Sequence, residues 1–167
     1  EIDENDWLEI QKVIKEAISN ILNFRQAEGV SLENEFQLRI GNIRSHMNEA
    51  LALDPERVQA IKDRLQTAIS ELKVNVDENR FEQELIYYLE KLDIIEEKVR
   101  LTNHLDYFLE TIKGKEANGR KLGFITQEMG REINTMGSKS NHAQMQKLVV
   151  MMKDELEKIK EQVLNVL

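Results

Sequence analysis

The chain has 167 residues, no cysteine and a formal net charge of −8. This length fits one domain, or two small ones at most. The lack of cysteine excludes disulfides and thiolate metal sites and is compatible with a cytoplasmic protein. No apolar run approaches the ~20 residues that a membrane span needs, and the acidic balance argues against nonspecific binding of nucleic acid by the chain as a whole. Neither a membrane nor DNA is therefore expected as a partner.

Helical periodicity dominates the chain and predicts an all-α fold. We expect an elongated helical bundle of about five to six helices with long antiparallel helix pairs. A first apolar stripe covers residues 10–24, Gly29 is expected to end that helix, and Ser31 is expected to cap the next one. Asp54 followed by Pro55 marks a further helix start, because an acidic N-cap and a proline at the first helical position are both favoured there.

The second half of the chain is expected to begin with one long helix capped by Asp77. Its apolar seam changes face near residues 99–101, which predicts a kink or a bridge between two packing environments. A polar loop is expected over residues 113–119. We treat residues 1–167 as one helical region, with a subdivision into a helical extension at 1–76 and a C-terminal helical domain at 77–167.

Two more helices are expected toward the C-terminus. The first should cover residues 122–136 and stop at Gly137 and Ser138. Ser140 is then favoured as an N-cap of the last helix. From residue 149 the apolar positions of that helix recur at spacings of three and four, which suits a close antiparallel helix pair or a coiled-coil contact. This seam is therefore the favoured self-association surface.

A polar stripe accompanies the apolar seam of the long central helix. Asp93, Glu97, Arg100 and His104 are separated by four, three and four residues, so they share one helical face. Carboxylates and an imidazole on one face can bind Mn²⁺ or Mg²⁺, and His104 alone can act as a general base. Ordinary surface ion pairs give the same spacing, so the stripe by itself favours a structural reading.

The densest group of charged side chains lies in the window GRKLGFITQEMGREINTMGSKS at 119–140. Glu128, Arg131 and Glu132 share one face of the expected helix. Arg120 and Lys121 sit at its start, where backbone N–H groups also favour anions. Residues 100–147 carry eight Lys or Arg against five acids, which permits a focused phosphate site on an acidic body.

Several segments resemble one known family. They are FRQAEG (24–29), VDENRFEQEL (76–85), IIEEKVRLTNHLDYF (94–108), the window at 119–140 and LVVMMKDELEKIKEQVLNVL (148–167). Together they are similar to the middle and C-terminal parts of the YicC/YloC-like family of bacterial endoribonucleases. The resemblance implies an N-terminal domain that is absent from this chain, a ring-like homo-oligomer at full length, and RNA held in a central space.

Together, the motifs and the resemblance make metal-dependent cleavage of RNA the leading hypothesis. The residues expected to be catalytic are Glu97, His104, Glu128 and Glu132. Those expected to bind RNA are Arg100, Arg120, Lys121, Arg131, Asn134 and Lys139, since phosphate contacts give affinity without sequence preference. The expected metal ligands, for Mn²⁺ or Mg²⁺, are Glu97, Glu128 and Glu132.

Two alternatives need no catalysis by this chain. One is an RNA-binding adaptor that delivers RNA to an RNA-decay nuclease and uses only the basic residues. The other is an oligomerisation module in which the motif forms an internal ion-pair network. The absent N-terminal domain can supply phosphate contacts or catalytic groups, so activity is expected of the full-length protein rather than of this chain alone.

Overall fold

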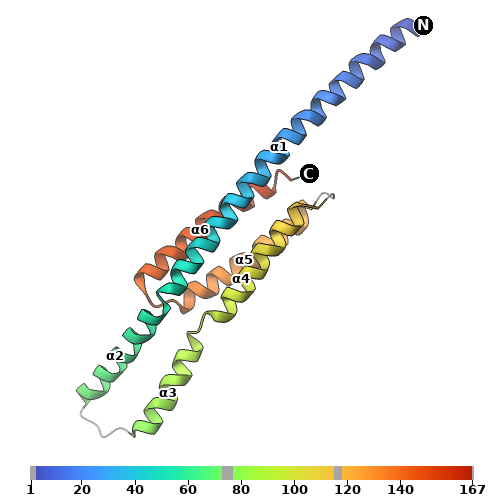
Figure 1. Ribbon diagram of the computed structural model, residues 1–167. Helices are drawn as coiled ribbons and strands as arrows, with labels where there is room; N and C mark the ends of the chain where they lie inside the picture. Colours follow the sequence, from blue (N-terminus) through green and yellow to red (C-terminus); the bar gives the residue numbers. More distant parts are fainter. Residues whose placement is uncertain (1–2, 73–76, 115–117, 167) are drawn as a thin grey trace. The chain divides into compact units, whose positions relative to one another are not determined.

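A computed structural model describes residues 3–72, 77–114 and 118–166 (Figure 1). The helices are α1 (Glu4–Ala52), α2 (Asp54–Leu72), α3 (Glu78–Lys91), α4 (Ile95–Ile112), α5 (Gly119–Lys139) and α6 (Ala143–Val163). The described ranges contain no strand, so the all-α prediction is confirmed. No helix within these ranges has the length and apolarity that crossing a membrane requires.

The helix α1 is longer than the sequence predicts. It continues through Gly29 and Ser31 without interruption, so the predicted break at Gly29 is wrong. A single glycine inside a helix costs only ~1 kcal/mol relative to alanine, and the helix-forming residues on both sides outweigh that cost. A Cβ atom at Gly29 meets no atom within 4 Å, so close packing does not require glycine here either.

The chain divides into two compact units, residues 1–37 and 38–167. The described part of the first unit is the beginning of α1, and the apolar stripe predicted there is exposed to solvent. Ile14 is 49% exposed and Phe24 is 67% exposed. Every contact described below lies inside the second unit.

The long central helix predicted from Asp77 is in fact two helices. Asp77 caps α3 as expected, because its side chain accepts hydrogen bonds from the backbone N–H groups of the first turn. The chain then leaves the helix between Leu92 and Ile94. Asp93 accepts a hydrogen bond from the N–H of Ile95, at the start of α4. The apolar seam therefore changes face near residues 99–101 because the helix is interrupted at residues 92–94, before α4 begins.

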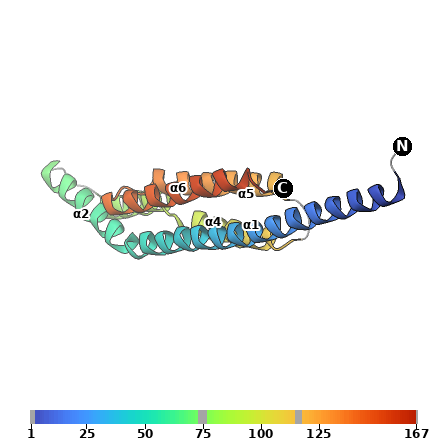
Figure 2. The ribbon, with the colours of Figure 1, turned by 90° about the horizontal axis from the view of Figure 1, so that it is seen from above.

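The core of the second unit is built from α4, α5, α6 and the second half of α1. Figure 2 shows α5 and α6 lying side by side in one layer. Helices α4 and α1 lie in a second layer beneath them. The buried side chains from these helices include Ile43 and Met47; Leu101, Leu105 and Phe108; Met129, Ile133 and Met136; and Met152, Leu156 and Ile159. Their spacings of three and four within each helix are those of an amphipathic helix, as predicted for the seam that begins at residue 149.

Two glycines of the 119–140 window are needed for close packing. A Cβ atom at Gly137 lies 3.0 Å from Cγ1 of Val149, where α5 meets α6. A Cβ atom at Gly119 lies 2.7 Å from the carbonyl oxygen of Val166, which leaves no room for a side chain. The antiparallel pairing predicted for the last helix is confirmed. The prediction that this seam is a self-association surface is wrong, because α6 buries the seam against its own chain.

The turn between α5 and α6 also differs from the prediction. Helix α5 continues through Gly137 and Ser138 and ends at Lys139. Ser140 is its C-cap residue, and the Ser140 hydroxyl donates to the carbonyl oxygen of Met136 at 2.6 Å. His142 caps α6 instead, so the prediction of Ser140 as an N-cap is wrong. The apolar packing of both helices extends α5 past the glycine, which local propensity alone does not reveal.

A buried carboxylate joins α1 to α6 within the second unit. Glu155 is 8% exposed and accepts hydrogen bonds from Arg39, Asn42 and Lys158. Burial by itself raises the pKa of this carboxyl, but the three donors outweigh burial and lower the pKa from 4.5 to about 2. Because the folded-state pKa lies below the unfolded one, Glu155 stabilises the fold above pH ~5 and loses this effect as the pH falls toward 2.

We expect Glu155→Gln to lower the free energy of unfolding by about 2 kcal/mol at pH 7. At pH 3 the difference between variant and parent should shrink to less than half, since the unfolded parent is then protonated. Urea unfolding at both pH values measures this. Glu157→Gln is the matched control, because Glu157 is exposed and pairs with Lys160 one turn away. A difference for Glu155→Gln that does not change with pH contradicts the assignment.

Candidate functional site

The predicted site residues lie in several environments. A first group, Glu97 and Lys139, belongs to a network around the buried side chains of Glu97 and Arg57. This network, here called the junction, lies where the start of α2, the turn before α4, the start of α4 and the end of α5 meet. The junction consists of Asp54, Arg57, Asp93, Glu97 and Lys139. A second group lies along the exposed side of α5. The two groups have different environments and are described separately.

Lys139 and Glu97 bind each other in the junction. The Lys139 ammonium lies 2.7 Å from Oε1 of Glu97 and also donates to the carbonyl oxygen of Asp93 at 2.9 Å. The Glu97 side chain is only 4% exposed. Its second oxygen, Oε2, is buried and has no hydrogen-bond partner among the described residues. A residue predicted to bind RNA therefore neutralises one predicted to be catalytic.

Arg57 completes the junction and was missed from the sequence. Its residue exposure is 2%. The guanidinium forms an ion pair with Asp54 at 2.7 Å and donates to the carbonyl oxygens of Leu92 and Lys139, each at 3.0 Å. A planar guanidinium with five donors suits such a set of fixed acceptors. The only local signal is the i, i+3 spacing of Asp54 and Arg57, which resembles an ordinary surface pair.

The exposed cations of α5 form a second feature, here called the basic face: Arg120, Lys121 and Arg131. All three residues are exposed. Arg131 pairs with Glu128 at 3.0 Å on the same helix, yet the Arg131 side chain remains 75% exposed. Arg120 and Lys121 are in contact with aromatic rings rather than with carboxylates. Among the residues that the structure describes, no acid pairs with either of these two cations.

Arg100 and Asn134, the other predicted RNA contacts, are also exposed. Arg100 forms an ion pair with Glu96, four residues away on α4. Such a pair on an exposed helix face stabilises the fold by only a few tenths of a kcal/mol. Arg100 therefore forms an ordinary surface ion pair, as one interpretation of the polar stripe on α4 predicted. Glu97 on the same helix points into the junction instead.

Two residues of the predicted site, Glu132 and His104, have titratable side chains without a hydrogen-bond or ion-pair partner among the described residues. Glu132 is 8% exposed, and His104 is half-buried on α4, the helix that packs against α5. Within the described ranges, neither side chain takes part in a hydrogen bond or an ion pair. Along the α4–α5 pair, both lie between the Glu97–Lys139 contact at one end and the Lys121–Tyr107 contact at the other.

The three predicted metal ligands are not assembled into a metal centre. No group of three or more His, Asp or Glu side chains within the described ranges is arranged to hold a metal ion. Glu97 is bound to Lys139, and Glu128 is bound to Arg131. Two of the three carboxylates thus already have a cation, and the three do not form a Mn²⁺ or Mg²⁺ site within the described ranges. The metal requirement itself stays a prediction.

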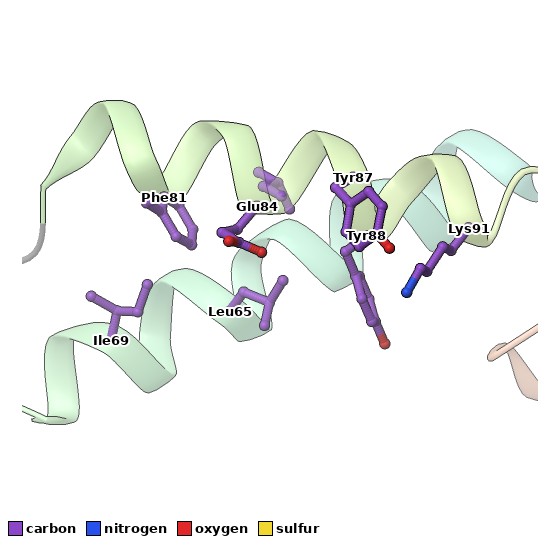
Figure 3. A pocket seen from close by; sticks show the side chains of 8 residues that line it. Leu65, Ile69, Phe81, Glu84, Tyr87, Tyr88 and Lys91 are labelled. Atoms are coloured by element: carbon purple, nitrogen blue, oxygen red, sulfur yellow. The ribbon is translucent and has the colours of Figure 1, made fainter.

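A groove of about 400 Å³ lies between α2 and α3 (Figure 3). Its lining is mostly apolar, with Leu65 and Ile69 from α2 facing Phe81 from α3. At one end, the Lys91 ammonium lies 4.3 Å from the ring centroid of Tyr87. The groove contains no residue of the 119–140 window, and its charged lining residues are one acid, Glu84, and one base, Lys91. It is therefore a poor surface for a polyanion.

Comparison with known proteins identifies the family. The family model of endoribonuclease YicC-like proteins, C-terminal, matches residues 50–167. The chain is 36% identical over 163 residues to a probable endoribonuclease YicC of Clostridioides difficile, covering 96% of this chain and 56% of that protein. It is 32% identical over 148 residues to the one of Haemophilus influenzae, covering 89% and 52%. The chain thus spans about half the length of the curated relatives it matches, and it belongs to the endoribonuclease YicC-like family.

Proposed function

We propose that the protein at its full length cleaves RNA phosphodiester bonds and that this chain supplies the surface that holds the RNA backbone. The observation that carries the proposal is the basic face. Arg120, Lys121 and Arg131 are exposed cations on one helix of a chain whose net charge is −8. Lys and Arg contacts to phosphate provide affinity that does not depend on base sequence. The names of the two relatives support RNA as the substrate.

Cleavage of a phosphodiester bond requires two proton transfers. The attacking hydroxyl or water loses a proton, and the leaving oxygen gains one. Glu132 and His104 are suited to these transfers, since a carboxylate and an imidazole without a fixed partner can exchange protons with a substrate. Glu97 is not suited, because its ion pair with Lys139 holds it in the junction. Glu128 is engaged by Arg131, so it serves to orient a cation.

The test is cleavage of an end-labelled RNA by the full-length protein, with EDTA, Mg²⁺ or Mn²⁺ added in parallel. Glu132→Gln should lower the cleavage rate about 100-fold, which is within the range for loss of a proton-transfer group. Glu128→Gln is the matched control and should stay within a few-fold of the parent. The EDTA arm measures the metal requirement independently of either variant.

Three results bear against this proposal in different ways. Parent-like cleavage by Glu132→Gln removes Glu132 from the mechanism. Equal losses for Glu128→Gln and Glu132→Gln indicate a general effect of charge on the basic face. Binding of RNA without cleavage in any metal condition identifies an adaptor rather than an enzyme. Circular dichroism of each variant establishes that the helices are intact.

A further inference from the structure

Two pairs of a cation and an aromatic ring lie next to each other at the start of α5. The Lys121 ammonium lies 4.7 Å from the ring centroid of Tyr107 on α4. The Arg120 guanidinium carbon lies 5.8 Å from the ring centroid of Phe124, one turn along α5. Phe124 lies three residues after Lys121 and four after Arg120, and such positions are neighbours on a helix surface, so Phe124 connects the two pairs.

Both rings are exposed although their sequence neighbours are buried. Phe124 is 56% exposed and Tyr107 is 45% exposed, whereas Ile125 is 5% exposed and Phe108 is fully buried. Helices α4 and α5 thus direct one apolar residue into the core and the adjacent aromatic ring outward. An exposed ring and two exposed cations therefore share this part of the α5 surface.

We infer that Tyr107 and Phe124 are stacking platforms for unpaired bases of single-stranded RNA. The inference rests on the proposed function, because it assigns a role to rings beside the basic face. Aromatic rings stack on bases of any sequence, and adjacent cations hold the phosphates. Both elements occur here within three residues of the first turns of α5 and one residue of α4. Bases inside a duplex are already stacked, so the platform selects unpaired RNA.

The chain provides an internal comparison for this patch. On α3, the Lys91 ammonium lies 4.3 Å from the ring centroid of Tyr87, and that ring is 56% exposed. The local contact resembles the two pairs on α4 and α5, but α3 carries four glutamates against two basic residues, Arg80 and Lys91. The glutamates of α3 are Glu78, Glu82, Glu84 and Glu90. A negatively charged backbone is repelled there, so Tyr87 is a matched control for ring exposure without phosphate binding.

The binding experiment uses the full-length protein and a fluorescently labelled RNA of twelve nucleotides, single-stranded or annealed to its complement. Phe124→Ala and Tyr107→Ala should each weaken binding of the single strand about 5- to 100-fold, the range for loss of one stacked base. Tyr87→Ala should leave the affinity unchanged. None of the three variants should alter binding of the duplex. A loss of single-strand affinity below twofold for both ring variants overturns the inference.

Salt dependence separates this inference from the proposed function. The double variant Arg120→Ala with Lys121→Ala should reduce the slope of log affinity against log salt by about 0.7 for each phosphate that the protein no longer neutralises. If this slope falls while both ring variants bind normally, the stacking inference is wrong and the proposed function stands. If the parent protein binds no RNA, both are wrong.

A spectroscopic readout tests stacking directly. Phe124→Trp in a Trp7→Phe background should bind the single strand at least as well as the parent, and its indole fluorescence should be quenched by RNA. Phe124→Leu keeps an apolar side chain without a ring face and should lose affinity as Phe124→Ala does. It therefore tests the ring itself if the alanine variant folds poorly. Light scattering tests the alternative that the Phe124 ring belongs to a protein interface. A change in molar mass of Phe124→Leu without RNA assigns the ring to a protein interface and overturns the inference.

Discussion

Replacing Arg57 by methionine is expected to lower the free energy of unfolding by about 4 kcal/mol. Breaking a buried ion pair by removing one partner typically costs about 3–5 kcal/mol. Arg57 is 2% exposed, and its loss leaves the carbonyl oxygens of Leu92 and Lys139 without their donors. Each buried acceptor left unsatisfied costs about 1–3 kcal/mol. Methionine fills part of the volume but supplies no donor.

Urea unfolding followed by circular dichroism measures this effect. Arg64→Met is the matched control, because Arg64 lies on the same helix and is exposed. Its effect should stay within about 0.5 kcal/mol. Arg57→Lys should give an intermediate loss, since one ammonium cannot reproduce the fork of donors that reaches all three acceptors. A loss below about 1 kcal/mol for Arg57→Met contradicts the view that the junction holds four segments together.

Much of the fold follows from local rules, and the errors show where those rules stop. The buried positions of α4, α5 and α6 follow from their apolar spacing, and Asp77 caps α3 as its residue type predicts. The predicted breaks at Gly29 and Gly137 failed for a shared reason. A glycine lowers helix stability by ~1 kcal/mol, and flanking helix formers or packing against α6 easily outweigh this amount.

The break between α3 and α4 illustrates the opposite case. No proline or glycine occurs between residues 89 and 97, so local propensity gives no reason to end a helix there. The carbonyl oxygen of Leu92 is freed from the helix and accepts from Arg57, 35 residues earlier in the chain. A tertiary hydrogen bond therefore replaces one that the helix would have made. A prediction made from the sequence of one helix at a time cannot include such a bond.

The same limit applies to the environments of the predicted site residues. The exposure of Arg120 and Arg131 follows from helical spacing, which places them opposite the buried residues of α5. The pairing of Lys139 with Glu97 does not, because the partners are 42 residues apart and on different helices. Spacing along one helix placed Glu97 beside Arg100 and His104 on a polar stripe. Burial at the junction decides its actual environment.

The junction also predicts how Lys139 acts. Lys139→Met should destabilise the fold by about 3 kcal/mol, because Glu97 then remains as a buried carboxylate without a cation. Within the described part of the chain its second oxygen already lacks a partner, so no described group compensates. The double variant Glu97→Leu with Lys139→Met should be less destabilised than the sum of the two single variants, by about 1–3 kcal/mol. Urea unfolding of all four proteins gives this coupling energy.

The pair of Glu96 and Arg100 is the matched control, since it joins the same residue classes on an exposed face of α4. Its coupling energy should not exceed about 0.5 kcal/mol. The opposing reading of Lys139 as a phosphate ligand predicts a different pattern: Lys139→Met would then weaken RNA binding and lower its salt slope while the unfolding curve stays unchanged. Because Lys139 is held by two acceptors at 2.7 and 2.9 Å, we expect the loss to appear in stability. In that case the proposed RNA contacts rest on the three cations of the basic face.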